Sequence, residues 1–192
     1  MGEQMYKTGK PSRRGVLLGM AAAGSLAACG NGVGSDGAER LDRAADASLN
    51  FLYGTAPATR ELGDQAAGIL IMPQITQAGF GFGGSFGKGV LRIGDVSVDY
   101  YSATQGSVGF QIGAQQYSHV LFFMTQEALM DFRSSSGWTA GAGARYAVNS
   151  DAATFGIDTT EVLHPVEAVV FAQAGAIAGA TIEGTKYTRI IP

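Results

Sequence analysis

The spacing of apolar residues predicts helices at two places in the chain. Four apolar residues recur at helical intervals and would share one face of a helix over residues 38–53: Leu41, Ala45, Leu49 and Leu52. A second, shorter helix is predicted over residues 58–67. A third is predicted over residues 126–133, where the Thr125 side chain can cap the first turn. These segments predict N-terminal helices and one mid-chain helix.

Elsewhere the pattern changes to the two-residue period of β-strands. The predicted strands are 69–72, 90–93, 96–101, 107–114, 118–124, 138–148, 166–172, 176–183 and 185–191, with a polar loop at 149–160. Gly94 and Asp95 form a two-residue hairpin turn between two of them. The expected fold is therefore α+β, with a strongly curved, mostly antiparallel β-sheet or a barrel-like core.

Glycines recur four residues apart inside the predicted strands. The pairs are Gly79 and Gly83, Gly109 and Gly113, Gly137 and Gly141, and Gly175 and Gly179. Residues four apart lie on the same side of a strand, so one side would be lined with glycine and the other with aromatic residues. Glycine inside a strand indicates a bend, a bulge or a close backbone approach, which is why we expect a curved sheet.

The start of the chain predicts an export signal over residues 1–28. A basic head precedes a short apolar run that ends at Leu26-Ala-Ala-Cys29-Gly, and this sequence resembles the lipobox of bacterial lipoproteins. Acylation would give Cys29, the only cysteine, a role. Ser12-Arg-Arg-Gly-Val-Leu17 resembles a twin-arginine signal, with general export as the alternative. Residues 29–37 would form a flexible tether, and residues 38–192 one domain.

Charge excludes one class of partner. The leader holds four of the 13 basic residues and one of the 16 acidic ones, so the mature chain keeps 9 and 15 and carries a net charge of −6. Nucleic-acid binding depends on neutralising phosphates with Lys and Arg, and we expect no nucleic-acid partner. Two histidines and one cysteine provide no zinc cluster, and we expect no metal or cofactor.

The segment GFGFGGSFGKG at residues 79–89 matches two catalytic motifs by spacing. G-x-G-x-x-G binds a dinucleotide only where a helix begins at its end, and the residues that follow are typical of a strand. G-x-S-x-G would make Ser85 a hydrolase nucleophile, with Asp158 and His164 in the order of an α/β-hydrolase. That motif also requires a strand-to-helix turn, so the segment predicts a curved strand and not an enzyme.

Five separated blocks resemble the SYLF, or Ysc84-type, domain family. They are GILIMPQITQAGFGFGGSFGKGVL at 68–91, GSVGFQIGAQ at 106–115, FMTQEAL at 123–129, FRSSSGW at 132–138 and EGTKYTRI at 183–190. The resemblance implies a domain that binds lipid, phosphoinositides in eukaryotic members through a basic N-terminal helix, with actin as a partner of some. Here that helix also carries Glu39, Asp42 and Asp46, which departs from the basic pattern.

These observations predict a lipid-anchored protein of the bacterial cell envelope, at the outer membrane or the periplasmic face. It would bind membrane lipid or an amphipathic ligand without catalysis; the alternatives are a structural or protein-interaction factor of the envelope and a serine hydrolase using Ser85. The candidate lipid-binding residues are four aromatic and four basic ones: Phe80, Phe82, Phe110 and Trp138, with Lys88, Arg92, Arg133 and Lys186.

Overall fold

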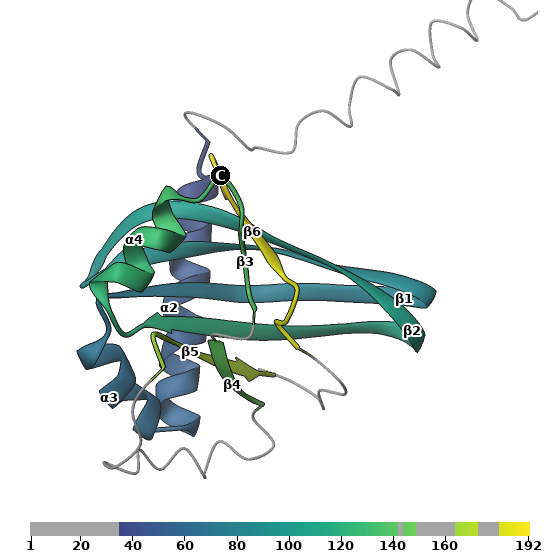
Figure 1. Cartoon of the computed structure of the whole chain (residues 1–192), viewed down its shortest axis with the longest axis horizontal. Coiled ribbons are helices and arrows are strands. Elements are labelled where there is room, and N and C mark those ends of the chain that lie inside the picture. The colour runs from purple at the N-terminus through teal and green to yellow at the C-terminus, as the bar shows by residue number, and fades with distance from the viewer. Residues whose placement is uncertain (1–34, 142–143, 149–163, 173–180) are drawn as a thin grey trace, which may run out of the picture. The chain divides into compact units, whose positions relative to one another are not determined.

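A computed structural model describes residues 35–141, 144–148, 164–172 and 181–192 (Figure 1). Within these ranges, the side chains of residues 80–81, 107–113 and 144–148 are not described. The predicted export signal, the lipidation site Cys29 and the polar loop at 149–160 lie outside the described residues. The account that follows concerns the domain from residue 35 onward.

The predicted helices are present. They are α2 (Gly37–Thr55), α3 (Ala58–Gln65) and α4 (Gln126–Ser134). On α2 the predicted apolar face is turned inward, with Ala45 and Leu52 fully buried. At the start of α4 the Thr125 hydroxyl accepts a hydrogen bond from the backbone N–H of Ala128 at 3.2 Å, as the capping residue predicted.

The strands form one curved sheet. They are β1 (Gly68–Ile93), β2 (Val96–Phe123), β3 (Trp138–Thr139), β4 (Ala144–Val148), β5 (Val166–Phe171) and β6 (Lys186–Ile190). The order is β3-β6-β2-β5-β4, with β1 paired to β2, and every pairing is antiparallel except the parallel one between β4 and β5. The predicted α+β class with a strongly curved, mostly antiparallel sheet is confirmed.

Two long strands replace several predicted short ones. The predicted end of a strand at Pro73 is wrong, because β1 continues to Ile93 with an irregularity in its pairing between Met72 and Ile75. A bulge tolerates proline since it interrupts the ladder hydrogen bonds that proline cannot donate. The predicted division of β2 near residue 115 is also wrong. The hairpin turn at Gly94 and Asp95 is confirmed, with Ile93 facing Val96 across it.

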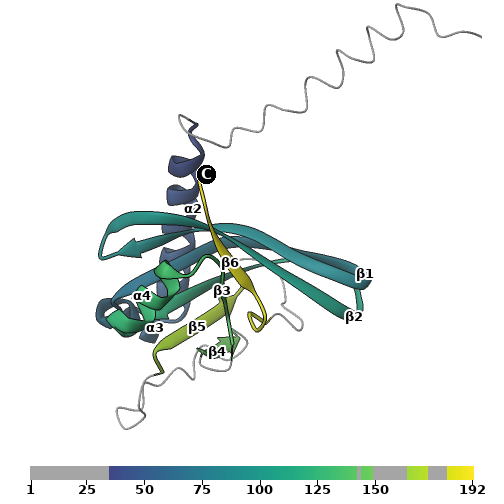
Figure 2. The same ribbon diagram turned by 45° about the horizontal axis from the view of Figure 1, so that its top comes forward.

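Strand β1 folds back on itself, and glycine permits the contact. A Cβ built on Gly79 would lie 2.7 Å from Cα of Gly83. Further from this point, a Cβ on Gly87 would meet the carbonyl oxygen of Gln74, and one on Gly89 that of Ile71. β2 follows β1 through this turn, and both strands reverse at the end of the domain away from the three helices (Figures 1 and 2). We call residues 79–86 and 104–113 the hairpin bend.

The sheet separates two buried apolar clusters. The inner one, enclosed by the curve, includes Leu70, Leu121 and Tyr187 and extends to Phe132 of α4. The outer one lies under α2 and includes Leu52, Ile71 and Phe122. Because side chains alternate along each strand, neighbouring residues such as Leu70 and Ile71 enter different clusters.

Polar contacts also hold α2 on the sheet. Its Asp42 carboxylate accepts hydrogen bonds from the Ser97 hydroxyl at 2.9 Å and the Tyr100 hydroxyl at 3.0 Å. One turn later, Asp46 pairs with Arg92 of β1 at 2.6 Å. Asp42 and Asp46, two of the three acidic residues that depart from the basic pattern of the N-terminal helix, therefore fix this helix to β1 and β2.

We expect Asp42→Ala to lower the free energy of unfolding by about 1–2 kcal/mol, because two hydroxyl groups lose a charged acceptor. Chemical denaturation measures the loss. The control is Arg43→Ala, which removes the exposed pair with Glu39 on the same helix and should cost no more than about 0.5 kcal/mol. Equal losses in the two variants would show that Asp42 contributes nothing beyond an ordinary surface charge.

Candidate functional site

The hairpin bend lies in a part of the chain that lacks charge. Residues 65–87 and 100–126 contain no Asp, Glu, Lys or Arg, although the mature chain has 24 such residues. These two segments contain the paired arms of β1 and β2, so the uncharged residues come together in space. A surface of this composition is suited to an apolar or uncharged ligand.

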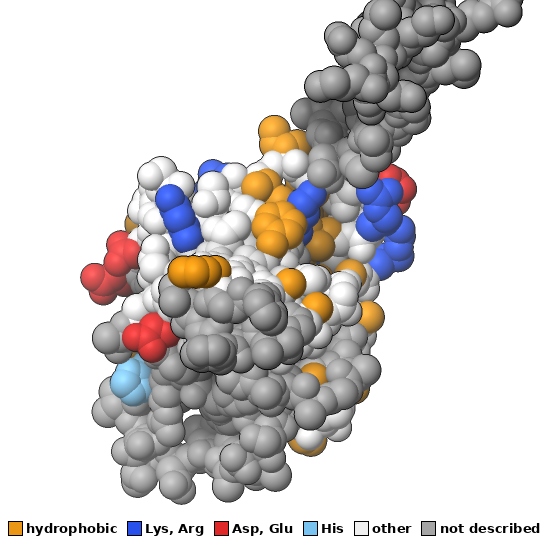
Figure 3. All heavy atoms as spheres, turned by 90° about the vertical axis from the view of Figure 1, so that its right-hand side faces the viewer, with side chains coloured by type: hydrophobic (Ala, Val, Ile, Leu, Met, Phe, Trp, Pro, Cys, Tyr) orange, Lys and Arg blue, Asp and Glu red, His pale blue; other side chains and the backbone are white. Residues whose placement is uncertain are grey.

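Phenylalanine side chains are exposed at the bend. Phe82 is 78% exposed and Phe86 is 52% exposed, whereas Ser85 between them is buried. Since Phe82 and Phe86 are four residues apart on one strand, both rings project from the outer side of the sheet. Viewed from the bend, the domain shows hydrophobic side chains with Lys or Arg side chains beside them (Figure 3). The side chains of the candidates Phe80 and Phe110 lie outside the described residues.

Two of the four basic candidates share this outer face. Phe86 faces Thr104 of β2, which in turn faces Lys186 of β6. Lys88 faces Ser102, two residues from Thr104 on the same side. A Cβ built on Gly137 would lie 2.5 Å from Cε of Lys186, so the stem of this lysine extends across the backbone there. The structure thus places Phe82, Lys88 and Lys186 on the same face of the sheet as Phe86.

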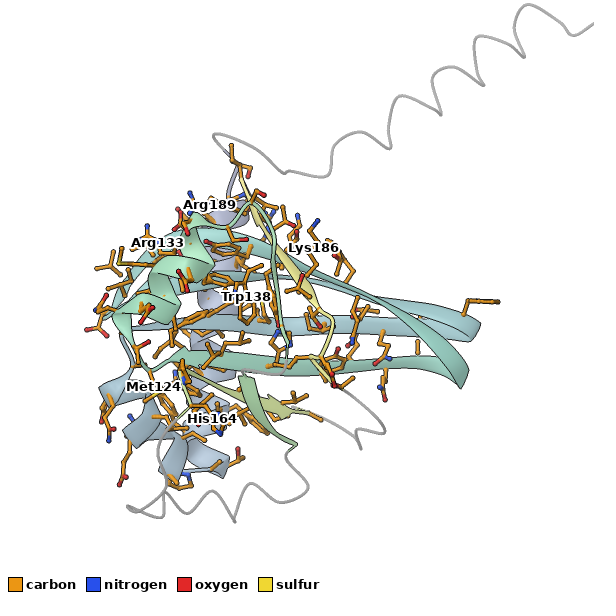
Figure 4. All side chains as sticks on the ribbon, in the orientation of Figure 1. Met124, Arg133, Trp138, His164, Lys186 and Arg189 are labelled. Carbon is orange, nitrogen blue, oxygen red and sulfur yellow. The ribbon has the colours of Figure 1, made fainter. Side chains whose placement is uncertain are left out.

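The remaining candidates lie elsewhere. Arg92 is held under α2 by Asp46. Arg133 of α4 pairs with Asp99 at 3.0 Å, and Arg189 contacts the same carboxylate at 3.4 Å (Figure 4). Trp138 packs in the inner cluster, with ring centroids 5.5 Å from Phe132 and 5.8 Å from Tyr187. The expectation that Trp138 and Phe82 line one apolar wall is therefore not met.

The sequence analysis did not select Phe86, which belongs to the site, and it did not select a buried polar pair that lies away from the exposed bend. Phe86 belongs to the quoted glycine-rich segment, and its four-residue spacing from Phe82 was the available signal. Tyr187 was not identified: its hydroxyl lies 2.8 Å from Nε2 of His119, and both side chains are buried. Burial lowers the pKa of His119 to about 3 and raises the pKa of Tyr187 well above its usual value. His119 is therefore neutral at physiological pH.

Ser85 does not lie on a nucleophile elbow. It is in the middle of β1, which continues as a strand for eight more residues, and its hydroxyl points toward Oε1 of Gln105 at 3.5 Å. His164 is exposed, and its backbone N–H donates to Glu167 at 2.9 Å. The third residue of the proposed triad, Asp158, lies outside the described residues. The strand-to-helix turn that the hydrolase motif needs is absent at Ser85.

The N-terminal helix differs from a basic lipid-binding helix. Arg40 forms an ion pair with Asp36, and Arg43 forms one with Glu39 at 3.7 Å, both within α2. The apolar side of the helix is occupied by the sheet. α2 thus offers an anionic headgroup only arginines that already have acidic neighbours.

Two kinds of feature are not found within the described residues. None of the helices in these ranges combines the length and apolar character required to cross a membrane. Nor do three or more His, Cys, Asp or Glu side chains in the same ranges gather where they could hold a metal ion.

Fold and surface together describe a curved α+β domain that exposes an uncharged aromatic bend. Comparison with family models gives the class of protein: residues 104–189 match the Ysc84 family, described as Las17-binding protein actin regulator. The match over these residues confirms the Ysc84, or SYLF, family that the sequence blocks predicted. This is a family of binding domains and not a known enzyme family. The matched region includes β2 from Thr104 onward, all of α4, and β6 as far as Arg189. No curated protein matches the chain.

Proposed function

We propose that the protein is a lipid-anchored, non-catalytic binding protein of the bacterial cell envelope whose domain binds lipid. The observation that carries this proposal is the absence of charge along both arms of the hairpin bend, where phenyl rings face solvent. Exposed apolar groups are costly in water, and contact with lipid removes that cost. The Ysc84 match supports a binding role, and the lipobox-like sequence at Cys29 supports attachment to a membrane.

The anchor is tested by Cys29→Ala in the full chain expressed in a bacterium. We expect the wild-type protein to remain with the membrane fraction after washing with salt and carbonate, because more than one acyl chain gives stable attachment. Mass spectrometry of its N-terminal peptide should show the acyl groups on Cys29. The variant should lack acyl groups. Those of its molecules from which the export signal has been cleaved should no longer be attached to the membrane.

The matched control is Asn31→Ala, two residues beyond the cysteine, which should behave as the wild type. An unmodified Cys29 in the mature wild-type protein would refute the anchor. For the domain itself, native mass spectrometry of the protein extracted from its membrane should reveal co-purified lipid. Protein cross-links without any bound lipid would favour the interaction-factor alternative.

A further inference from the structure

We propose that the hairpin bend inserts into the headgroup layer of a lipid bilayer, with Phe82 and Phe86 reaching the apolar region and Lys88 and Lys186 at the phosphates. The inference rests on the proposed function, because it takes membrane attachment through Cys29 as given. Beyond that function, it specifies that the hairpin bend contacts a lipid bilayer and how deeply the bend enters it.

The lack of charge along both arms of the bend favours a bilayer over a protein partner. Protein interfaces have a polar rim, whereas an acyl layer accepts no charged group without a large cost. Phe82 and Phe86 are among the most exposed large apolar residues that the structure describes, and they project from one side of β1. Together they form an apolar projection that has no acidic residue on either arm.

The two lysines occupy the positions that such an insertion requires. Lys88 lies two residues behind Phe86 on the same side of β1, and Lys186 lies across Thr104 from Phe86. Their long aliphatic stems can follow the apolar surface while the ammonium groups reach phosphate oxygens. Cations at this level are attracted by anionic lipids, although the domain as a whole is acidic.

Backbone pairing limits the depth of insertion. Among the described strands, β1 is hydrogen-bonded to β2 only, so the other edge of β1 presents backbone N–H and C=O groups. Such groups are not tolerated in the hydrocarbon of a membrane without partners. The bend should therefore enter the interface, where water and headgroups satisfy its outer edge, and should not cross the bilayer.

The predicted tether is long enough for this contact. The Ser35 hydroxyl donates to the carbonyl oxygen of Pro192 at 3.1 Å, so the folded domain begins beside the end of β6. From Tyr100, which faces Ile190, to Val108, which faces Phe82, β2 runs eight residues, or about 26 Å. The six residues from Cys29 to Ser35 reach at most about 21 Å. A domain anchored at Cys29 can therefore place the bend on the same membrane when β2 is inclined to the membrane normal.

The test adds one tryptophan reporter per variant to the lipidated full chain, which keeps Trp138 and is reconstituted into vesicles of phosphatidylethanolamine and phosphatidylglycerol. One set of vesicles has brominated acyl chains, which quench tryptophan emission on contact. We expect Phe82→Trp to show a blue shift and quenching several-fold stronger than Met130→Trp. Met130 of α4 is the control because it is 67% exposed but lies between Glu127 and Asp131. Wild-type protein gives the background from Trp138.

Flotation of the same samples separates the two proposals. Protein that floats with the vesicles while the Phe82→Trp reporter is quenched no more than the Met130→Trp reporter overturns the insertion and leaves the lipid anchor intact. If the protein fails to float with the vesicles, both the lipid anchor and the insertion of the bend are refuted. Phe86→Trp is a second reporter if Phe82→Trp misfolds, and circular dichroism checks both variants. The emission of the Phe82→Trp variant could also shift with protein concentration and not with lipid. That result would identify the bend as a contact between two copies of the protein, and it would also overturn the insertion.

Discussion

Gly89→Ala is expected to lower the free energy of unfolding by about 3 kcal/mol, because overpacking a site that cannot relax is costly. The new methyl group would clash with the backbone oxygen of Ile71 and with the sulfur of Met72. The methionine can move, but the backbone oxygen belongs to the opposite arm of β1. Relief of the clash therefore requires the folded strand to open. Urea denaturation followed by circular dichroism measures the change.

Gly106→Ala is the matched control in the same sheet. A Cβ at that position would meet nothing within 4 Å, so this variant should be as stable as the wild type or slightly more stable. If both variants lost a similar free energy of unfolding, glycine would be needed in β1 and β2 for its backbone freedom and not for the close approach of the two arms. A loss confined to Gly89→Ala would establish the close approach of the two arms of β1.

The second large effect is the pH dependence of stability due to His119. Burial holds the pKa of His119 at about 3 in the folded protein, against an ordinary value of 6.5. Below pH 6.5 the unfolded chain binds a proton that the folded protein does not, so stability falls as the pH falls toward 3. The slope is about 1.4 kcal/mol per pH unit. Between pH 6 and pH 4 this one group should therefore remove about 2–3 kcal/mol.

His119→Gln should remove that part of the pH dependence, because glutamine does not titrate and can still hydrogen-bond to the Tyr187 hydroxyl. The measurement is urea denaturation of wild type and variant at a series of pH values from 4 to 7. His164→Gln replaces the exposed histidine and is the control. If the wild type and His119→Gln lose stability in parallel with acid, the burial of His119 does not govern the acid response.

The helices were predictable because their signals are local. Leu52 belongs to a helical repeat that predicts α2, and Thr125 is a capping residue directly before α4. The strands were predicted in pieces because Pro73 and the glycines are typical of strand ends. In the folded protein β2 pairs with β1 on both sides of Pro73, with a register shift between Met72 and Ile75, and β1 continues past it. Pairing between distant residues decided the result, and no local pattern contains that information.

The candidate surface was predictable in part, for a related reason. Phe82 and Lys88 lie on one strand, so their shared side follows from the two-residue period. The placing of Arg92 depends on Asp46, and that of Arg133 on Asp99, both more than 30 residues away in the sequence. Trp138 entered the inner cluster through contacts with α4 and β6, which only the folded chain brings together.

The two-residue turn between β1 and β2 bears on how the domain assembles. These strands are consecutive in the sequence and pair along nearly their whole length, so the largest part of the sheet can zip outward from Gly94 and Asp95. Each new pair closes only a small loop, which favours rapid formation. β5 and β6 would then add to a hairpin that already exists. A polypeptide that emerges from the ribosome in order would complete this hairpin before its last third has been synthesised.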